Sequence, residues 1–211
     1  MNTGKIREVN VPLKPRIKVK KKTYKRLIET MNEAIITNVK RMFTERKLHD
    51  IQVHEEDDDT RVTAKETGGQ LVMVKAASGG RLNINAVKEC IGVFTEEEVS
   101  LGIILYEGNP TASAKNTLHH VDSMGEVRIQ IFHLDSLKYC LLDHRLTPRH
   151  IKLTKNKAVD FKKKYDVLKI PVMLSSDPVA KFMYYRPGDI IEIHRRNGYV
   201  SYRLVKGSGL K

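Results

Sequence analysis

Short apolar runs alternate with helical patterns between residues 71 and 134, and this alternation restricts the possible folds more than any other feature. Strands are predicted at residues 71–74, 99–106 and 127–134. A helical pattern covers 85–93, and a second helix runs to about Val121 from Asn109, which can cap a helix, and Pro110, which fits a first turn. Strands that alternate with helices predict an α/β layer with helices packed on a sheet.

An amphipathic stripe precedes this region. Apolar residues recur at i, i+3, i+4 and i+7 spacing at Tyr24, Leu27, Ile28, Met31, Ala34, Ile35, Val39, Met42 and Phe43. This periodicity predicts one helix with a single buried face. Five consecutive carboxylates follow at 55–59. Because they repel one another and cannot all face one ion, they predict a solvated loop rather than a metal site.

The last third of the chain has different signals. Thr154 can cap a helix over 155–165, and Asp177-Pro178 is a cap followed by proline that opens a short helix through Phe182. Asn197-Gly198 separates two extended runs, 190–193 and 199–205. Asn-Gly between such runs predicts a β-hairpin, since both residues tolerate positive φ. Together these signals predict a small α+β unit that ends in a hairpin.

The net charge of +13 is unevenly distributed. Residues 1–26 carry ten Lys/Arg and one acidic residue, residues 27–141 carry twelve against eighteen, and residues 142–211 carry sixteen against six. Basic ends around an acidic middle suggest separate domains with different partners, and nucleic acid or an acidic protein surface would suit the basic ones. Pro12 and Pro15 break any helix in the basic stretch 1–22, which is predicted to be a flexible arm.

Several classes of site and protein are disfavoured. No stretch approaches the roughly 18 apolar residues of a membrane helix, and a soluble, intracellular protein is expected. Cys90 and Cys140 are isolated, which is typical of ordinary thiols in a reducing compartment. The histidines (His119, His120, His133, His144 and His150) show no ligand pair at i, i+4 spacing, so structural roles are expected and no metal is predicted.

The sequence also lacks the motifs of common catalytic sites. The glycine pairs 68–69 and 79–80 are not followed by the Lys-Ser/Thr of a phosphate-binding loop, and there is no Gly-x-Ser-x-Gly. A metal-dependent nuclease needs clustered carboxylates near a lysine, but Met73 stands two positions before Lys75. The sequence therefore predicts no enzyme, no cofactor and no small-molecule substrate.

Four short segments of the last third resemble the assembly domain of the fifth subunit of nuclear RNA polymerases, a family that includes a shorter archaeal polymerase protein. They are HRLTPRH at 144–150, SDPVAK at 176–181, RPGD at 186–189 and YVSYRLV at 199–205. The helix from Tyr24, the strand at 102–105 and the segment 108–115 resemble the N-terminal jaw domain of the nuclear members, which archaeal members lack. The resemblance therefore implies an α/β jaw domain with a mixed sheet at 23–141, and an assembly domain at 142–211.

The sequence departs from the family in four places. Pro110 comes earlier than the proline of the family's Thr-Pro-Ser-Ala-Lys, and an alanine is added. The turn 195–198 is shorter than the family's loop, Met183-Tyr184-Tyr185 replaces a more usual aromatic-glycine pair, and the arm 1–22 has no counterpart. These departures are typical of a divergent member, such as one encoded by a large DNA virus.

The resemblance implies that the assembly domain docks on the largest polymerase subunit, next to other polymerase subunits. Candidate interface residues are His144, Pro148, His150, Asp177, Pro178, Arg186, Gly188, Tyr202 and Arg203. Tyr and Arg are enriched at interface hot spots. Tyr202 and Arg203 are strand neighbours that face opposite ways, so they cannot both point into one interface. Alternatively, Tyr202 faces the core and Arg203 is solvated.

The resemblance also implies that the jaw approaches downstream double-stranded DNA. Candidate DNA-proximal residues at the start of the predicted helix are Asn109, Pro110, Thr111, Ser113 and Lys115. Free N–H groups at a helix start favour a phosphate, and such a contact positions DNA without reading its sequence. A plain helix cap is the alternative, and the acidic balance of 27–141 argues against extensive DNA wrapping.

The expected function is a non-catalytic structural and assembly subunit of a DNA-dependent RNA polymerase. A free-standing basic DNA-binding protein is the alternative, supported by the charged ends, and a metal-dependent nuclease is a third and weaker one. The expected location is the nucleus if the chain is cellular, or a cytoplasmic virus factory or virion if it is viral.

Overall fold

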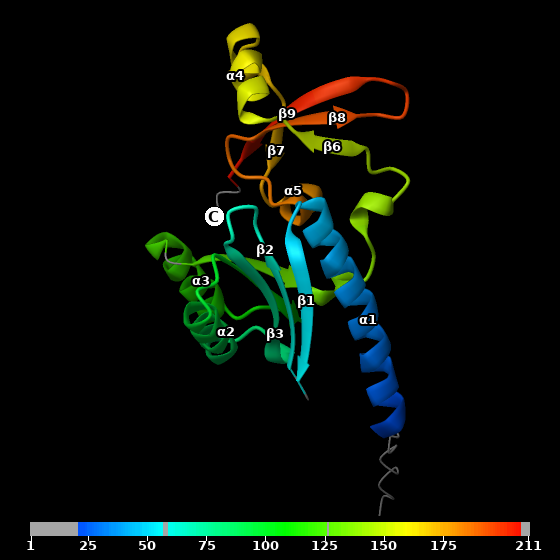
Figure 1. Ribbon diagram of the computed structural model, residues 1–211, viewed down its shortest axis with the longest axis vertical. Coiled ribbons are helices and arrows are strands. Elements are labelled where there is room, and N and C mark those ends of the chain that lie inside the picture. Colours follow the sequence, from blue (N-terminus) through cyan, green and yellow to red (C-terminus); the bar gives the residue numbers. More distant parts are fainter. Residues whose placement is uncertain (1–20, 57–58, 126, 208–211) are drawn as a thin grey trace, which may run out of the picture.

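The computed structural model describes residues 21–56, 59–125 and 127–207, and it contains two β-sheets (Figure 1). The first sheet has the strand order β1-β2-β3-β4-β5, and the second has the order β6-β8-β9-β7. A mixed α/β architecture was predicted, and the two sheets with their helices confirm it. The predicted arm 1–22 lies outside the described residues up to position 20, and its last two residues already belong to the first helix.

The first sheet is half antiparallel and half parallel. Its strands are β1 (His49–Glu56), β2 (Asp59–Lys65), β3 (Leu71–Arg81), β4 (Leu101–Glu107) and β5 (Arg128–His133). β1, β2 and β3 pair antiparallel, whereas β3, β4 and β5 pair parallel. The parallel half requires crossover connections. These are the helices α2 (Ile84–Glu96) and α3 (Ala112–Met124), close to the segments that the sequence predicts.

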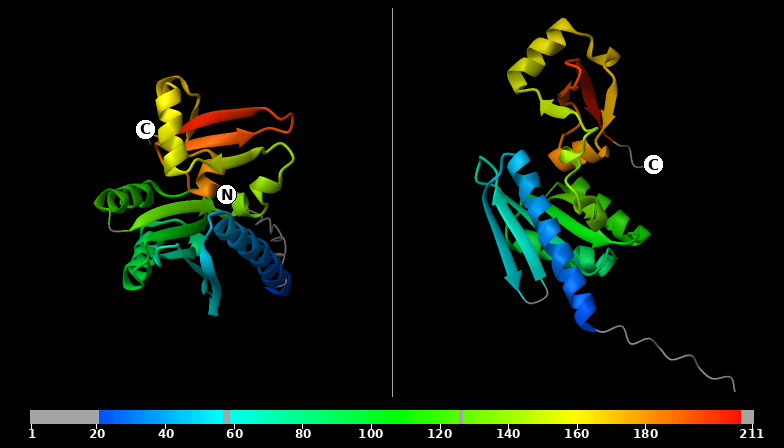
Figure 2. Two further views of the ribbon diagram at one scale, coloured as in Figure 1. Left: turned by 45° about the horizontal axis from the view of Figure 1, so that its top comes forward. Right: turned by 90° about the vertical axis from the view of Figure 1, so that its right-hand side faces the viewer.

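Helices cover both faces of this sheet, as the views in Figures 1 and 2 agree. On one face lies α1 (Lys21–Glu45), whose buried residues Ile35, Val39, Met42 and Phe43 confirm the end of the predicted stripe. Ala34 is exposed, so its place in the stripe is wrong. The side chains of the four earlier members lie outside what the structure describes. On the other face, α2 and α3 pack over Met73 and Ile104.

Two strands were missed where the sequence suggests only a solvated acidic loop. Glu55 lies in β1 opposite Thr60 of β2, and only 57–58 of the acidic run fall outside the described residues. The reason is packing, because Val62 and Ala64 of β2 are buried in the same cluster as Phe43. Their alternating spacing, matched by Ile51 and Val53 of β1, was the available signal.

The second sheet carries two helices. Its strands are β6 (Arg149–Lys152), β7 (Val172–Leu174), β8 (Ile190–His194) and β9 (Val200–Lys206); the helices are α4 (Lys155–Lys164) and α5 (Pro178–Met183). Three 3-10 turns lie at Leu134–Leu137, Leu141–Asp143 and Val167–Lys169. β6 and β7 were not predicted. Both are edge strands of only four and three residues, too short for a pattern to appear.

β8 and β9 pair antiparallel, with Arg195 to Tyr199 between them. The Arg195 N–H donates to Tyr199 O (2.9 Å), and the Gly198 N–H donates to Arg195 O (3.0 Å). Gly198 has a φ of 77°, but Asn197 does not adopt positive φ, contrary to the expectation for both residues. The Asn197 side chain instead accepts a hydrogen bond from the Tyr199 N–H (3.1 Å), as asparagine commonly does in turns.

Candidate functional site

The predicted DNA-proximal segment starts α3 differently from the expectation. Thr111 is the N-cap, and its hydroxyl oxygen accepts a hydrogen bond from the Ala114 N–H (3.2 Å). Asn109 and Pro110 therefore precede the cap, and their predicted roles as cap and first-turn residue are wrong. Thr111 is the N-cap because it stands three residues before Ala114. Ala114 is fully buried and so fixes the register of the helix. Ser113 and Lys115 are exposed in its first turn.

This assignment predicts different costs for two substitutions. Thr111→Ala should lower the free energy of unfolding by about 1 kcal/mol, because it removes an N-cap acceptor. Asn109→Ala should change it by less than about 0.5 kcal/mol, as is usual at an exposed position. Chemical denaturation of the three proteins checks this. If Asn109→Ala lowers the free energy of unfolding more than Thr111→Ala does, Asn109 is the N-cap instead.

Four of the predicted interface residues line one groove of about 580 Å³ on the second sheet: Pro148, His150, Asp177 and Arg203. They come from the entry to β6, the start of α5 and the middle of β9, which lie far apart in the sequence. Leu146, Val172 and Leu174 add exposed apolar side chains to the same groove. Apolar walls with polar groups between them are typical of a protein-binding surface.

Local hydrogen bonds hold these four residues in place. The Asp177 carboxylate accepts from the Val179 N–H (2.9 Å) and so caps α5, as the Asp177-Pro178 pair predicts. Nδ1 of His150 lies 2.8 Å from Pro148 O, which can only accept, so Nδ1 carries a proton and donates it to this carbonyl. Burial lowers the pKa of the histidine. Arg203 donates from Nη1 to Val172 O (3.0 Å) across the sheet.

The other predicted interface residues lie elsewhere. Tyr202 faces α4, where its ring centroid lies 4.6 Å from that of Phe161, so it cannot share the groove with Arg203. His144 is exposed and its Nδ1 accepts from the Leu146 N–H (3.3 Å). Pro178 is exposed on α5, and Gly188, with a φ of 92°, lines a second and larger groove. Arg186 lies at the junction between the sheets.

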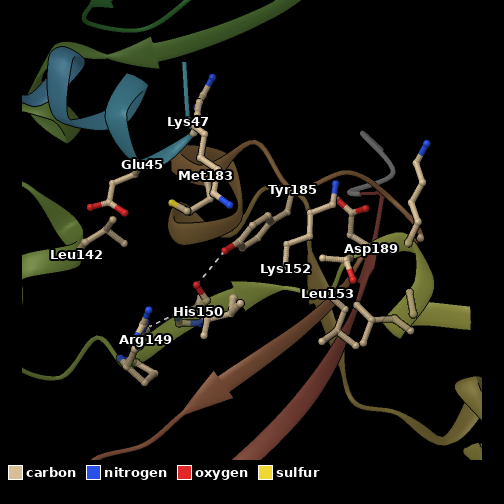
Figure 3. Close-up of a pocket in the computed structure, with 18 of the residues that line it drawn as sticks. Glu45, Lys47, Leu142, Arg149, His150, Lys152, Leu153, Met183, Tyr185 and Asp189 are labelled. Atoms are coloured by element: carbon tan, nitrogen blue, oxygen red, sulfur yellow. Dashed lines mark hydrogen bonds and ion pairs between the residues drawn. The ribbon is translucent and has the colours of Figure 1, made fainter. Parts of the chain in front are cut away.

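The larger groove has a volume of about 1270 Å³ and follows the outer edge of β6 (Figure 3). Leu153 N–H donates to Ile190 O (3.0 Å), so the backbone groups of odd-numbered residues face β8, and those of His150 and Lys152 face outward. The Tyr185 hydroxyl donates to the outward carbonyl of His150 (3.3 Å) and caps this strand edge. No pattern in the sequence signals this role of Tyr185.

The two sheets meet at a junction around Arg46. No pattern in the sequence indicates this junction. Arg46 follows α1, and its guanidinium donates from Nε to Phe182 O (2.8 Å) and from Nη2 to Lys181 O (3.1 Å), both on α5. Nη2 also donates to Oε1 of Gln130 on β5 (2.9 Å). Phe182 itself belongs to the core of the first sheet. The second sheet is therefore fastened to the first through α5.

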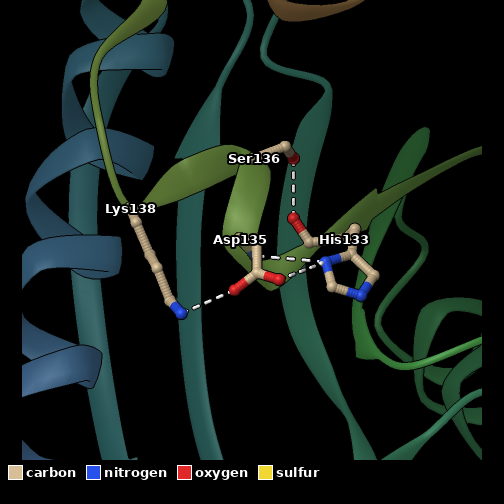
Figure 4. Close-up of polar contacts among 4 residues, drawn as sticks. All are labelled: His133, Asp135, Ser136 and Lys138. Carbon is tan, nitrogen blue, oxygen red and sulfur yellow. Dashed lines mark hydrogen bonds and ion pairs between the residues drawn. The ribbon is translucent and has the colours of Figure 1, made fainter.

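The polar cluster in Figure 4 shows a structural use of a histidine. His133 caps the 3-10 turn Leu134–Leu137, since its Nδ1 accepts from the Asp135 N–H (3.2 Å). Lys138 Nζ lies 2.6 Å from Asp135; this contact lowers the pKa of the carboxyl and raises that of the lysine. The turn directs the fully buried Leu137 into the core.

Among the described residues, neither a candidate metal site nor a helix able to span a membrane is found. No group of three or more His, Cys, Asp or Glu side chains in this part of the chain is arranged to hold a metal ion. None of the helices there combines the length and apolarity that crossing a membrane requires.

Comparisons with known proteins bear on the second sheet and its helices. Residues 139–205 match the family described as RNA polymerase Rpb5, C-terminal domain. A protein of Invertebrate iridescent virus 6, named as DNA-directed RNA polymerase subunit 454R, is 34% identical over 124 residues, which cover 54% of this chain and 65% of the relative. The matched region thus extends beyond the family domain.

Two relatives from cellular organisms are also named as subunits of DNA-directed RNA polymerases. The rpabc1 subunit of DNA-directed RNA polymerases I, II and III of Dictyostelium discoideum is 24% identical over 130 residues, covering 59% of this chain and 66% of the relative. Its counterpart in Caenorhabditis briggsae is 25% identical over 131 residues, covering 59% and 61%. The chain thus spans less than two thirds of the length of each relative. Residues 139–205 are thus similar to the RNA polymerase Rpb5 C-terminal domain, and the resemblance to the fifth polymerase subunit is confirmed.

Proposed function

We propose that this chain is a non-catalytic structural subunit of a multisubunit DNA-dependent RNA polymerase. In this proposal a C-terminal assembly domain, residues 142–211, docks on the largest subunit, and an N-terminal jaw domain, residues 23–141, lies near downstream DNA. The observation that carries it is the groove that contains Pro148, His150, Asp177 and Arg203 within the Rpb5-type domain. The cellular or viral location follows from the source of the polymerase, as the mixed origin of the relatives suggests.

The composition of the groove supports docking of a protein rather than a small metabolite. Leu146 is 74% exposed and Leu174 is 51% exposed, which leaves apolar surface that a partner would cover. Arg195 and Arg203 give the same groove a positive rim. An acidic surface with apolar side chains at its centre would fit both features, because complementary charge steers association and burial of apolar area stabilises it.

The proposal that the jaw lies near DNA rests on the residues around the start of α3. Asn109, Ser113 and Lys115 are exposed around the start of α3, where a phosphate could approach. The Ala114 N–H is already used by Thr111, so fewer donors remain than at an uncapped helix. We therefore propose a single positioning contact to the DNA backbone at this place, without sequence reading.

Docking is tested with two neighbouring arginines. Arg195 lines the groove and Arg196 does not, and both are exposed. In affinity purification of the tagged full chain, Arg195→Glu should reduce recovery of the largest polymerase subunit roughly tenfold, since like charges across an interface are costly. Arg196→Glu should leave recovery unchanged. Deleting 142–211 is a poorer test, because it removes Phe182 from the core of the first sheet.

The same affinity purification distinguishes the docking proposal from a second candidate function, that of a free-standing basic DNA-binding protein. That candidate is favoured by α4, where Lys155, Lys157, Lys162, Lys163 and Lys164 are all exposed. If the wild-type chain is recovered without polymerase subunits and only with nuclease-sensitive DNA, the docking proposal is wrong. A steep loss of DNA affinity with added salt would then support the DNA-binding candidate.

A further inference from the structure

Three arginines surround one aromatic ring at the junction between the two sheets. The Cζ atoms of Arg186, Arg46 and Arg128 lie 4.9, 5.3 and 5.8 Å from the ring centroid of Tyr184. Tyr184 follows α5 in the left-handed conformation, with a φ of 57°. The ring attracts each cation, but the three guanidinium groups repel one another. A cluster of this kind requires negative charge nearby.

Three described carboxylates, those of Glu66, Asp122 and Asp189, lie around the cluster, fewer than the five Arg and Lys side chains there. Glu66 lies 3.8 Å from Arg128, and Asp189 is engaged by Lys152 at 2.8 Å. A cavity of about 440 Å³ opens beside Tyr184, and it is lined by Arg46, Lys47, Lys152 and Arg186, with Glu66 as the acidic member. The cavity thus has an excess of positive charge, and apolar Leu48, Val72 and Leu101 form part of its wall.

Arg46 carries the second observation. Nε and Nη2 of its guanidinium are hydrogen bonded, but the buried Nη1 has no hydrogen-bond partner in the part of the chain that the structure describes. Burial lowers the pKa of Arg46 to about 9, so the group is charged at neutral pH. A buried, charged donor without an acceptor is destabilising and rare in folded proteins, and here it belongs to a residue that lines the cavity.

We propose that this cavity binds an oxyanion, which Arg46 and Arg186 hold between their guanidinium groups while Lys47 adds charge. Guanidinium groups offer donors in a planar fork that matches phosphate and carboxylate oxygens. Arg186 is exposed and forms the outer side of the site, whereas Arg46 forms its buried side. The ligand offsets the charge of the cluster and links the segment that follows α1, which contributes Arg46, to the segment between α5 and β8, which contributes Arg186.

The test uses inorganic phosphate and the full chain. At fixed ionic strength, replacing chloride with phosphate at about 100 times its dissociation constant should raise the Tm by roughly 5 °C or more. Arg186→Ala should weaken phosphate binding roughly tenfold or more, because it removes a charge-assisted contact. Arg186 is exposed, so this variant should fold. Arg196→Ala, an exposed arginine of the β8–β9 turn, is the matched control and should behave like the wild type.

Two outcomes would overturn the proposal: equal stabilisation by chloride and phosphate, or an equal phosphate response in Arg186→Ala and Arg196→Ala. If the proposal holds, competition identifies the source of the oxyanion. A hexa-aspartate peptide that displaces phosphate at lower concentration than a nucleoside monophosphate would assign the site to carboxylates of a polypeptide. The opposite order would assign it to a phosphorylated ligand.

Discussion

Gly102→Val is expected to lower the free energy of unfolding by about 3 kcal/mol, the upper end of the usual cost of overpacking a core. A Cβ atom at position 102 would lie 2.3 Å from two carbon atoms of the Phe94 ring and 2.9 Å from a third. Phe94 belongs to α2 and is fully buried, among Val87, Cys90 and Ile104. The ring cannot move aside without displacing these neighbours, so the strand and the helix must separate. Urea unfolding of the purified chain measures the loss.

Gly92→Ala is the matched control for this substitution. Gly92 lies on the exposed side of α2, and no atom lies within 4 Å of a Cβ built there. Alanine in place of glycine within a helix should raise the free energy of unfolding by about 0.5 to 1 kcal/mol. If Gly102→Val proves neutral while Gly92→Ala stabilises, the close packing of β4 against Phe94 is wrong.

The elements that the sequence predicts best are those with long patterns. β4 and β5 have enough apolar residues to be found alone, and Asp177-Pro178 marks the start of α5 because capping is a local effect. β6 and β7 are three or four residues long and exist because longer strands pair with them, which no local pattern reveals. Asn109 and Thr111 can both cap a helix, and only burial of Ala114 decides between them.

The candidate sites divide in the same way. Pro148, His150, Asp177 and Arg203 were predicted as interface residues from a family resemblance, and the structure places them in one groove. Alternation along a strand correctly separated Tyr202 from Arg203. The junction was missed because its contacts are distant in sequence. Arg46 bonds to residues 84 and 136 positions away, and its partners include backbone carbonyls, which carry no identity in a sequence. Such a site can be recognised only from the three-dimensional arrangement of the two sheets.

Arg46→Ala is expected to lower the free energy of unfolding by about 3 kcal/mol, because hydrogen bonds to charged groups contribute roughly 1.5 to 3 kcal/mol each and are not additive. Two of its acceptors, Lys181 O and Phe182 O, are in the last turn of α5, where a cation also interacts favourably with the helix end. Arg41→Ala in α1, the helix that Arg46 follows, is the control. Arg41 makes an exposed pair with Glu45 (3.0 Å), which should be worth less than about 1 kcal/mol.

A double-mutant cycle tests whether the loss arises at the junction. Arg46→Ala and Gln130→Ala should show a coupling free energy of about 0.5 to 3 kcal/mol, as expected for side chains in direct contact, here 2.9 Å apart. Additive losses would mean that Arg46 stabilises α1 alone and does not connect it to β5. Since Nη2 of Arg46 contacts both Gln130 on β5 and Lys181 O on α5, strong coupling would place this side chain at the contact between β5 and α5. A fixed junction of this kind would suit the proposed function, in which the domain proposed to dock orients the proposed jaw near DNA.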